Sequence, residues 1–293
     1  MTATATAADL DTATTSSSGG LLRFIRRNPT IAFGGLLLVV LVGLALAAPW
    51  ISADPFKQTP ANRLRPPSSQ FWFGTDRYGR DVFARTLHGA QVSLRVGFYV
   101  ALLSSAIGLI LGLLCGYYRR FDAVVMRVMD GLMAIPSILL AIALITLTRP
   151  GLGIVITAIV IPEVPRIVRV VRAVVLSIKS QPYIESAIAG GTRTFKLLAK
   201  HILPNTMAPL IVQATYVCAS AMLIEAGLSF LGAGVPPEIP SWGNIIAQSR
   251  DFFQIAPWAI LIPGGFLALT VLAVNMLGDG LRDRLDPRLA RRM

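Results

Sequence analysis

Charged residues are scarce in this chain. Of its 293 residues, 14% are charged and 54% are hydrophobic, and the mean hydropathy is +0.65. Soluble domains carry about 25% charged residues, so the long apolar blocks exclude an ordinary soluble domain and indicate an integral membrane protein. The net charge of +12 lies mostly beside these blocks. It therefore fits membrane topology better than phosphate binding, and we expect no nucleic-acid partner.

Cysteine and histidine are also rare. Cys115 and Cys218 each lie inside an apolar block, and His88 and His201 are far apart along the chain. This spacing matches neither a disulfide framework nor a metal site. The sequence contains no phosphate-binding Gly-x4-Gly-Lys-Ser/Thr loop, nucleophile elbow or zinc motif. We therefore expect no catalytic residue, no metal and no cofactor bound by this chain.

Six apolar stretches are long enough to form membrane-spanning helices, which need about 20 residues to cross about 30 Å of hydrocarbon. They predict an all-α, polytopic membrane protein, because the alternating pattern of a membrane barrel is absent. In the fourth stretch lie Glu163, Pro165 and Arg166, so we expect that helix to leave the membrane there and continue inside. The predicted spans are 31–51, 94–117, 124–147, 152–171, 207–231 and 256–277.

Lysine and arginine are distributed unevenly between the two sides. With the N-terminus inside, 18 lie in inner segments and eight in outer ones, so the positive-inside rule places both termini in the cytoplasm. Residues 1–20 are rich in Ala, Thr and Ser and predict a disordered cytoplasmic tail. The remaining divisions are 21–93 with the first span and a long outer loop, 94–278 as the transmembrane core, and 279–293 as a cytoplasmic tail.

Small residues recur at four-residue spacing in the second span. Ser104, Gly108, Gly112 and Gly116 would share one face of a helix. Small residues on such a face let membrane helices approach closely. We interpret the face as a helix-packing surface, which says nothing about a substrate.

The longest inner loop lies between the fourth and fifth spans and is polar. Glu185 opens a helix-compatible stretch, where the helix dipole favours its charge. Two adjacent glycines then predict a sharp turn between short helices, or close contact with another chain. An ordinary cytoplasmic loop with a surface helix is the alternative. The small residues of this stretch are Ser186, Ala187, Ala189, Gly190 and Gly191.

A second short helix is expected after the glycines, lying near the membrane plane. Leu203 and Pro204 are expected to end it and return the chain to the membrane, because proline disfavours continuation of a helix. Its predicted apolar stripe consists of Phe195, Leu197, Leu198 and Ile202.

The loop resembles the coupling loop of binding-protein-dependent ABC importer permeases, which reads Glu-Ala-Ala, three residues, Gly and a later Ile-Leu-Pro. Ser186 replaces the central alanine of that pattern. The positions that match it are Glu185, Ala187, Gly191, Ile202, Leu203 and Pro204.

Further segments resemble the C-type permeases of dipeptide and oligopeptide importers, in the right order along almost the whole chain. Many members have a tryptophan before the proline that is here Pro165, whereas this chain has Val164. The segments are FGTDRYGRDVFARTLHGAQVSLRVG (73–97), YIESAIAGGTRTFKLLAKHILPN (183–205), EAGLSFLGAGVPPEIPSWGNII (225–246) and NMLGDGLRDRLDPR (275–288).

The resemblance implies a six-span type I ABC importer permease fold in the bacterial inner membrane. The implied partners are a homologous B-type permease, two ATP-binding subunits that hold ATP and Mg, an extracytoplasmic substrate-binding protein and membrane lipid. Residues 183–205 would form the coupling loop, with Glu185–Gly191 docking on an ATPase. The implied cargo is a di- or oligopeptide, and nickel, glutathione or another small solute is the alternative. An intramembrane enzyme would need paired aspartates or Ser/His at membrane depth.

Three carboxylates at expected membrane depth are functional candidates, because charge is costly in lipid. Asp130 is expected to pair with Arg127 on one helix face, with gating as the alternative. Glu163 can pair with Arg166, which we prefer, or meet the amino terminus of a peptide. Glu225 can line the translocation path or bond to a neighbouring helix.

Overall fold

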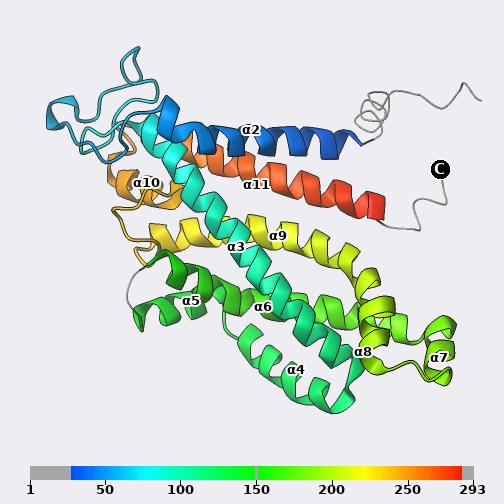
Figure 1. Ribbon diagram of the computed structural model, residues 1–293. Helices are drawn as coiled ribbons and strands as arrows, with labels where there is room; N and C mark the ends of the chain where they lie inside the picture. Colours follow the sequence, from blue (N-terminus) through cyan, green and yellow to red (C-terminus); the bar gives the residue numbers. More distant parts are fainter. Residues whose placement is uncertain (1–27, 149–150, 286–293) are drawn as a thin grey trace, which may run out of the picture.

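The computed structural model describes residues 28–148 and 151–285, and these are almost entirely helical (Figure 1). Within these ranges no β-strand forms, and an isolated antiparallel bridge joins Thr75 and Asp81. The all-α class predicted from the sequence is confirmed. The predicted disordered tail, residues 1–20, and the end of the predicted C-terminal tail lie outside the described residues.

The helices follow the chain in an order that Figure 1 shows by colour. They are α2 (Pro29–Ile51), η1 (Pro60–Asn62), α3 (Val82–Tyr117), α4 (Arg119–Met133), α5 (Ser137–Thr146), α6 (Leu152–Lys179), α7 (Pro182–Ala189), α8 (Thr194–Leu197), η2 (Leu198–Ile202), α9 (Leu203–Phe230), α10 (Trp242–Ser249), η3 (Arg250–Phe252) and α11 (Trp258–Leu285).

Four helical stretches in the described chain are long and apolar enough to cross a membrane: α2, α3, the run Thr194–Phe230 and α11. A fifth is added if the bent pair of α4 and α5 is one span. The predicted fourth span lies in α6, which is not among them because Glu163, Arg166 and Arg169 fall within it. The count of six spans is therefore not confirmed. The expectation that this helix continues beyond its apolar part is correct, since α6 runs to Lys179.

The third predicted span, 124–147, is not one straight helix. The chain breaks between α4 and α5, and the two helices are bent by 88°. Pro136 is the cause, because its ring disfavours helical backbone at Ile135 and it has no N–H to donate. The prediction of an unbroken span here is wrong.

The second predicted span begins earlier than expected. The helix α3 starts at Val82 rather than Leu94, and the Asp81 carboxylate caps it by accepting a hydrogen bond of 2.9 Å from the N–H of Phe83. The end of the predicted outer loop is therefore helical. The remaining connection, residues 52–81, is called the α2–α3 loop below.

The small-residue face of α3 lies against α6. A Cβ atom added to Gly108, Gly112 or Gly116 would lie 2.5–2.6 Å from a side chain of α6, which is closer than real Cβ atoms approach their neighbours. The three glycines therefore allow the backbones of the two helices to come together, as small residues do between membrane helices. The α6 side chains that fill the space are Ile167, Val171 and Val175.

The elongated molecule has two distinct ends (Figure 1). At one end lie α7 and α8, together with the start of α2 and the end of α11. At the opposite end lie the α2–α3 loop and α10. The two polar parts of the molecule are therefore separated by the length of the apolar helices.

Candidate functional site

Residues 183–205 form two short helices joined by a turn. The first, α7, begins at Pro182, where the missing N–H of proline costs no helical hydrogen bond. Glu185 lies in the first turn of α7, where the positive end of the helix dipole favours a carboxylate. This is the placement that the sequence predicts for Glu185.

A Schellman motif ends α7 at the two glycines. The N–H of Thr192 donates to the carbonyl oxygen of Ala187 at 3.1 Å, and the N–H of Gly191 donates to that of Ile188 at 3.0 Å. Gly191 has a φ of +74°, in the left-handed region that favours glycine. Gly190 and Gly191 thus make the sharp turn expected between the short helices.

One side of α7 is anchored and the other is open. Ile184 is fully buried, as is Leu197 of α8, so both helices are held against the rest of the molecule. The helix exposes one carboxylate, several very short side chains and two larger ones, Tyr183 and Ile188, which are 48% and 46% exposed. The other exposed residues of α7 and its turn are Glu185, Ser186, Ala189, Gly190 and Gly191, with Ala187 half-buried.

The chain passes from α8 into α9 without a break. The π-helical turn η2 connects them, and Leu203 and Pro204 form the first turn of α9, where proline is tolerated. The expectation that these two residues end a helix is wrong. Of the predicted apolar stripe, Leu197 and Ile202 are fully buried, Leu198 is half-buried and Phe195 is 83% exposed. Its position near the membrane plane stays a prediction.

Ion pairs connect α6 to α4. Asp130 Oδ1 lies 2.6 Å from Nη2 of Arg169, and Asp122 pairs with Arg172. The predicted partner of Asp130, Arg127, is therefore wrong. Because α4 packs beside α6, Asp130 pairs with a guanidinium 39 residues away in sequence. A rule for residues three or four apart on one helix cannot identify such a partner.

Glu163 is fully buried in α6, and its Oε1 lies 3.2 Å from Nη1 of Arg166. This is the ion pair preferred from the sequence. Arg166 also lines a cavity of about 310 Å³ at the bend between α4 and α5, together with Pro136 and Pro162. A gating role for Asp130 or Glu163 stays a prediction.

Comparison with known proteins decides the family. Residues 108–291 match the model of the binding-protein-dependent transport system inner membrane component, and residues 20–67 match that of the N-terminal TM domain of oligopeptide transport permease C. The chain belongs to this family of inner membrane transport components. It is therefore a multi-pass membrane permease of the ABC importer type and not an enzyme.

Individual relatives cover nearly the whole permease. A probable peptide ABC transporter permease of Sinorhizobium fredii is 56% identical over 272 residues, which are 93% of this chain and 94% of the relative. The dipeptide transport system permease DppC of Alkalihalophilus pseudofirmus is 42% identical over 90% of this chain and 88% of its own length. A chain of the methionine ABC transporter MetNI, solved in inward-facing conformations, has a TM-score of 0.56 at 21% identity. It covers 69% of this permease and 96% of itself, and supports the fold.

Glu225 of the permease joins three helices near the end that carries α10. Its Oε1 accepts hydrogen bonds of 2.8 Å from the hydroxyls of Ser229 and Ser241. Ser241 caps α10, and the next residue, Trp242, donates from its indole N–H to a carbonyl oxygen of α3 at 3.0 Å. Of the two roles considered for Glu225, bonding to a neighbouring helix is present. A role in the translocation path stays a prediction.

A buried ionic network lies at the same end, and sequence reasoning missed it. The carboxylate of Asp76 accepts hydrogen bonds of 2.7 Å from both Arg80 and Arg85. Both arginines also donate to Oε1 of Gln248 in α10, at 2.7 and 3.1 Å. Burial raises the pKa of Asp76, but the two guanidiniums and two backbone N–H groups outweigh it and hold the pKa below its usual range. The network ties the α2–α3 loop to α10.

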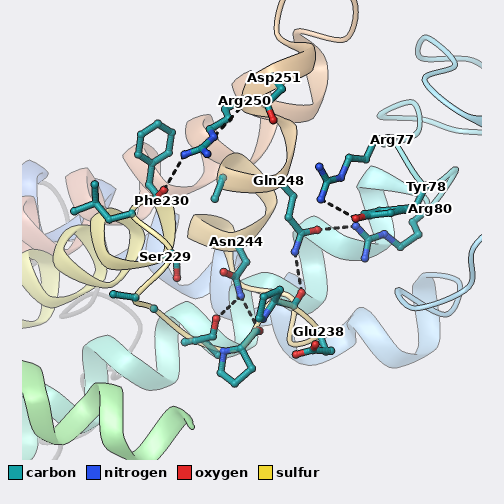
Figure 2. Close-up of a pocket in the computed structure, with 18 of the residues that line it drawn as sticks. Arg77, Tyr78, Arg80, Ser229, Phe230, Glu238, Asn244, Gln248, Arg250 and Asp251 are labelled. Carbon is teal, nitrogen blue, oxygen red and sulfur yellow. Dashed lines mark hydrogen bonds and ion pairs between the residues drawn. The ribbon is translucent and has the colours of Figure 1, made fainter. Parts of the chain in front are cut away.

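A cavity of about 790 Å³ opens beside this network (Figure 2). Its walls come from the α2–α3 loop, the turn after α9, α10 and η3. Part of the long outer loop predicted from the sequence thus lines a pocket. Partners more than 160 residues apart in sequence build it, so local motifs could not reveal it. Among the described residues, no three His, Cys, Asp or Glu side chains cluster to hold a metal.

Proposed function

We propose that this permease is the C-type subunit of an importer that carries di- or oligopeptides into the cell. The match of residues 20–67 to an oligopeptide permease domain supports this cargo, as do the peptide and dipeptide permeases among its relatives. Nickel, glutathione or another small solute is the alternative cargo. The positive-inside rule supports cytoplasmic termini, because the arginine-rich and lysine-rich segments belong to the end with α7.

The exposed side of α7 is the proposed contact with an ATP-binding subunit. The observation that carries this proposal is its shape: Ile184 anchors the helix from behind, while Ser186, Gly190 and Gly191 form an exposed patch without long side chains. Such a patch can enter a groove of another protein without ordering flexible groups, so little side-chain entropy is lost there. Glu185 adds a single negative charge to it.

The proposed partners complete the transport cycle. A homologous B-type permease would form the other half of the path, and a binding protein would deliver cargo at the end with α10. Two ATP-binding subunits would hold ATP and Mg. Because ATP shifts a two-state equilibrium only by binding one state more tightly, α7 must transmit that preference to α6, which directly precedes it in the chain, and through α8 to α9.

The docking proposal is tested by enlarging the exposed side of α7. We expect Ser186→Arg to reduce both co-purification of the ATP-binding subunits and ATP-driven uptake in proteoliposomes, because a long cation replaces a hydroxyl that bonds only within α7. Ala123→Arg, at an exposed position of α4, is the matched control and should change neither. Unchanged co-purification and uptake in Ser186→Arg would refute docking through α7.

A second pair of variants separates the turn from the surface. Gly191→Leu forces a branched side chain into a left-handed backbone, whereas Gly191→Asn keeps a residue that tolerates this conformation. We expect the leucine variant to lose coupling and the asparagine variant to keep most of it.

The same uptake assay identifies the cargo when dialanine, glutathione and nickel compete in turn for transport. Competition by nickel alone would contradict a peptide cargo.

A further inference from the structure

The cavity at the end with α10 carries an excess of positive charge on one wall. Asp76 is shared by Arg80 and Arg85, so one cation of this buried trio is not neutralised. Arg77 adds a further cation at the rim, and its guanidinium lies 4.6 Å from the ring centre of Tyr78. Figure 2 shows Arg77, Tyr78 and Arg80 together on this wall.

Arg77 has hydrogen-bonding capacity to spare. Its Nη2 donates to the hydroxyl of Tyr78 at 2.7 Å, but its Nε is buried and has no hydrogen-bond partner among the described residues. Arg80, by contrast, is occupied by Asp76 and Gln248. A guanidinium has five N–H donors, and Arg77 lines the cavity while donating one of them to Tyr78, so its remaining donors can bind an acceptor that enters the cavity. A guanidinium fork matches a carboxylate best.

The cavity also contains a carboxylate that can bind a positively charged group. Nε of Arg250 lies 3.5 Å from Oδ1 of Asp251, so the charges of these two residues neutralise each other. Glu238 is exposed on the turn before α10 and comes from a different segment than Arg77. The cavity therefore offers a cationic and an anionic group from two separate walls, as a zwitterionic guest requires.

We propose that this cavity binds the free ends of a short peptide, with its carboxylate on Arg77 and its ammonium group on Glu238. The inference rests on the proposed peptide cargo and adds a binding site on the permease itself. An extended peptide of two or three residues is about 7–11 Å long, and a cavity of about 790 Å³ is of the size that holds such ligands. The net positive charge of the buried group formed by Asp76, Arg80 and Arg85 also favours a carboxylate at this wall.

The test uses the purified complete transporter without its binding protein. Calorimetry measures the binding of dialanine, its C-terminal amide and its N-acetyl derivative. We expect Arg77→Gln to weaken dialanine binding by about ten- to a hundredfold, the range for a lost hydrogen bond to a charged group, and to leave the amide unaffected. Glu238→Gln should weaken dialanine binding and leave the N-acetyl derivative unaffected.

Matched variants exclude general effects of charge. Arg65→Gln removes an exposed arginine from the same loop outside the cavity and should bind dialanine as the unaltered transporter does. Arg77→Lys keeps the positive charge but loses the paired donors of the guanidinium. Its affinity for dialanine should lie between those of the unaltered transporter and Arg77→Gln. The inference is overturned if the unaltered transporter binds no dialanine, if Arg77→Gln binds it normally, or if Arg65→Gln loses as much affinity.

Further outcomes distinguish a peptide site from a docking surface and from a different cargo. If Arg77→Gln weakens association with the binding protein but keeps its dialanine affinity, the cavity is a docking surface and the peptide site is wrong. If ATP-driven dialanine uptake proceeds but no variant changes dialanine binding, the cavity inference fails while the proposed function stands. If the transporter moves another solute and no peptide, the proposed cargo itself fails.

Discussion

At the scale of single residues, Asp76 holds two buried arginines. Replacement by asparagine would leave Arg80 and Arg85 without a counter-charge in a buried site. Breaking a buried ion pair in this way costs about 3–5 kcal/mol. We expect Asp76→Asn to lower the unfolding temperature in detergent strongly, and Asp54→Asn, in the same loop but exposed, to change it little. Equal unfolding temperatures of the two variants would contradict the role given to Asp76.

The same carboxylate predicts an acid-sensitive loop. The pKa of Asp76 is lower in the folded chain than its usual value near 3.9, so the unfolded state binds more protons as the pH falls. Its contribution to stability is therefore complete well above pH 4 and is lost as the pH falls through the folded pKa. Thermal unfolding between about pH 6 and 3 should show this loss in the unaltered chain, and a shallower acid dependence in Asp76→Asn.

Residues near one another in sequence were the easier ones to interpret. The glycine turn at Gly191 and the pair of Glu163 with Arg166 follow from local rules, and the structure contains both. Asp130 pairs with Arg169 on another helix instead, and Asp76 is linked to Gln248 of α10 through Arg80, which donates to both. Such partners depend on how the helices pack, which a single sequence does not encode in any local spacing.

At the scale of helices, the contact of α3 with α6 depends on the absence of side chains. A Cβ at Gly112 would lie 2.6 Å from Val171, whereas one at the exposed Gly43 of α2 would have nothing within 4 Å. Overpacking costs about 1–3 kcal/mol or more. We expect Gly112→Leu to lower the unfolding temperature and the yield of folded permease, and Gly43→Leu to be tolerated. If both variants unfold alike, close packing at Gly112 is not needed.

Helix limits were less predictable than helix positions. Apolar residues run on both sides of Pro136, so hydropathy indicates one span, while the proline turns the chain by 88°. The opposite happens in α6, where Pro162 and Pro165 stay within a continuous helix. Burial of α6 among its neighbours outweighs the cost of the two prolines there, whereas the exposed connection at Pro136 has no such support.

At the scale of the whole molecule, the two polar ends must face opposite sides of the membrane. Gly190 lies at the end with α7 and Glu238 at the end with α10, and both positions are exposed. The excess of positive charge in the inner segments predicts that the first faces the cytoplasm.

We test this with Gly190→Cys and Glu238→Cys in a background whose two cysteines are alanine. An impermeant maleimide should label position 238 in intact spheroplasts and position 190 only in inverted vesicles that lack the ATP-binding subunits, which would otherwise cover it. Gly190 has a φ of −73°, so cysteine fits there without strain. The reverse labelling would overturn the orientation and move the proposed ATPase contact to the wrong side, while labelling of both positions from one side would contradict a membrane-spanning arrangement of the helices between them.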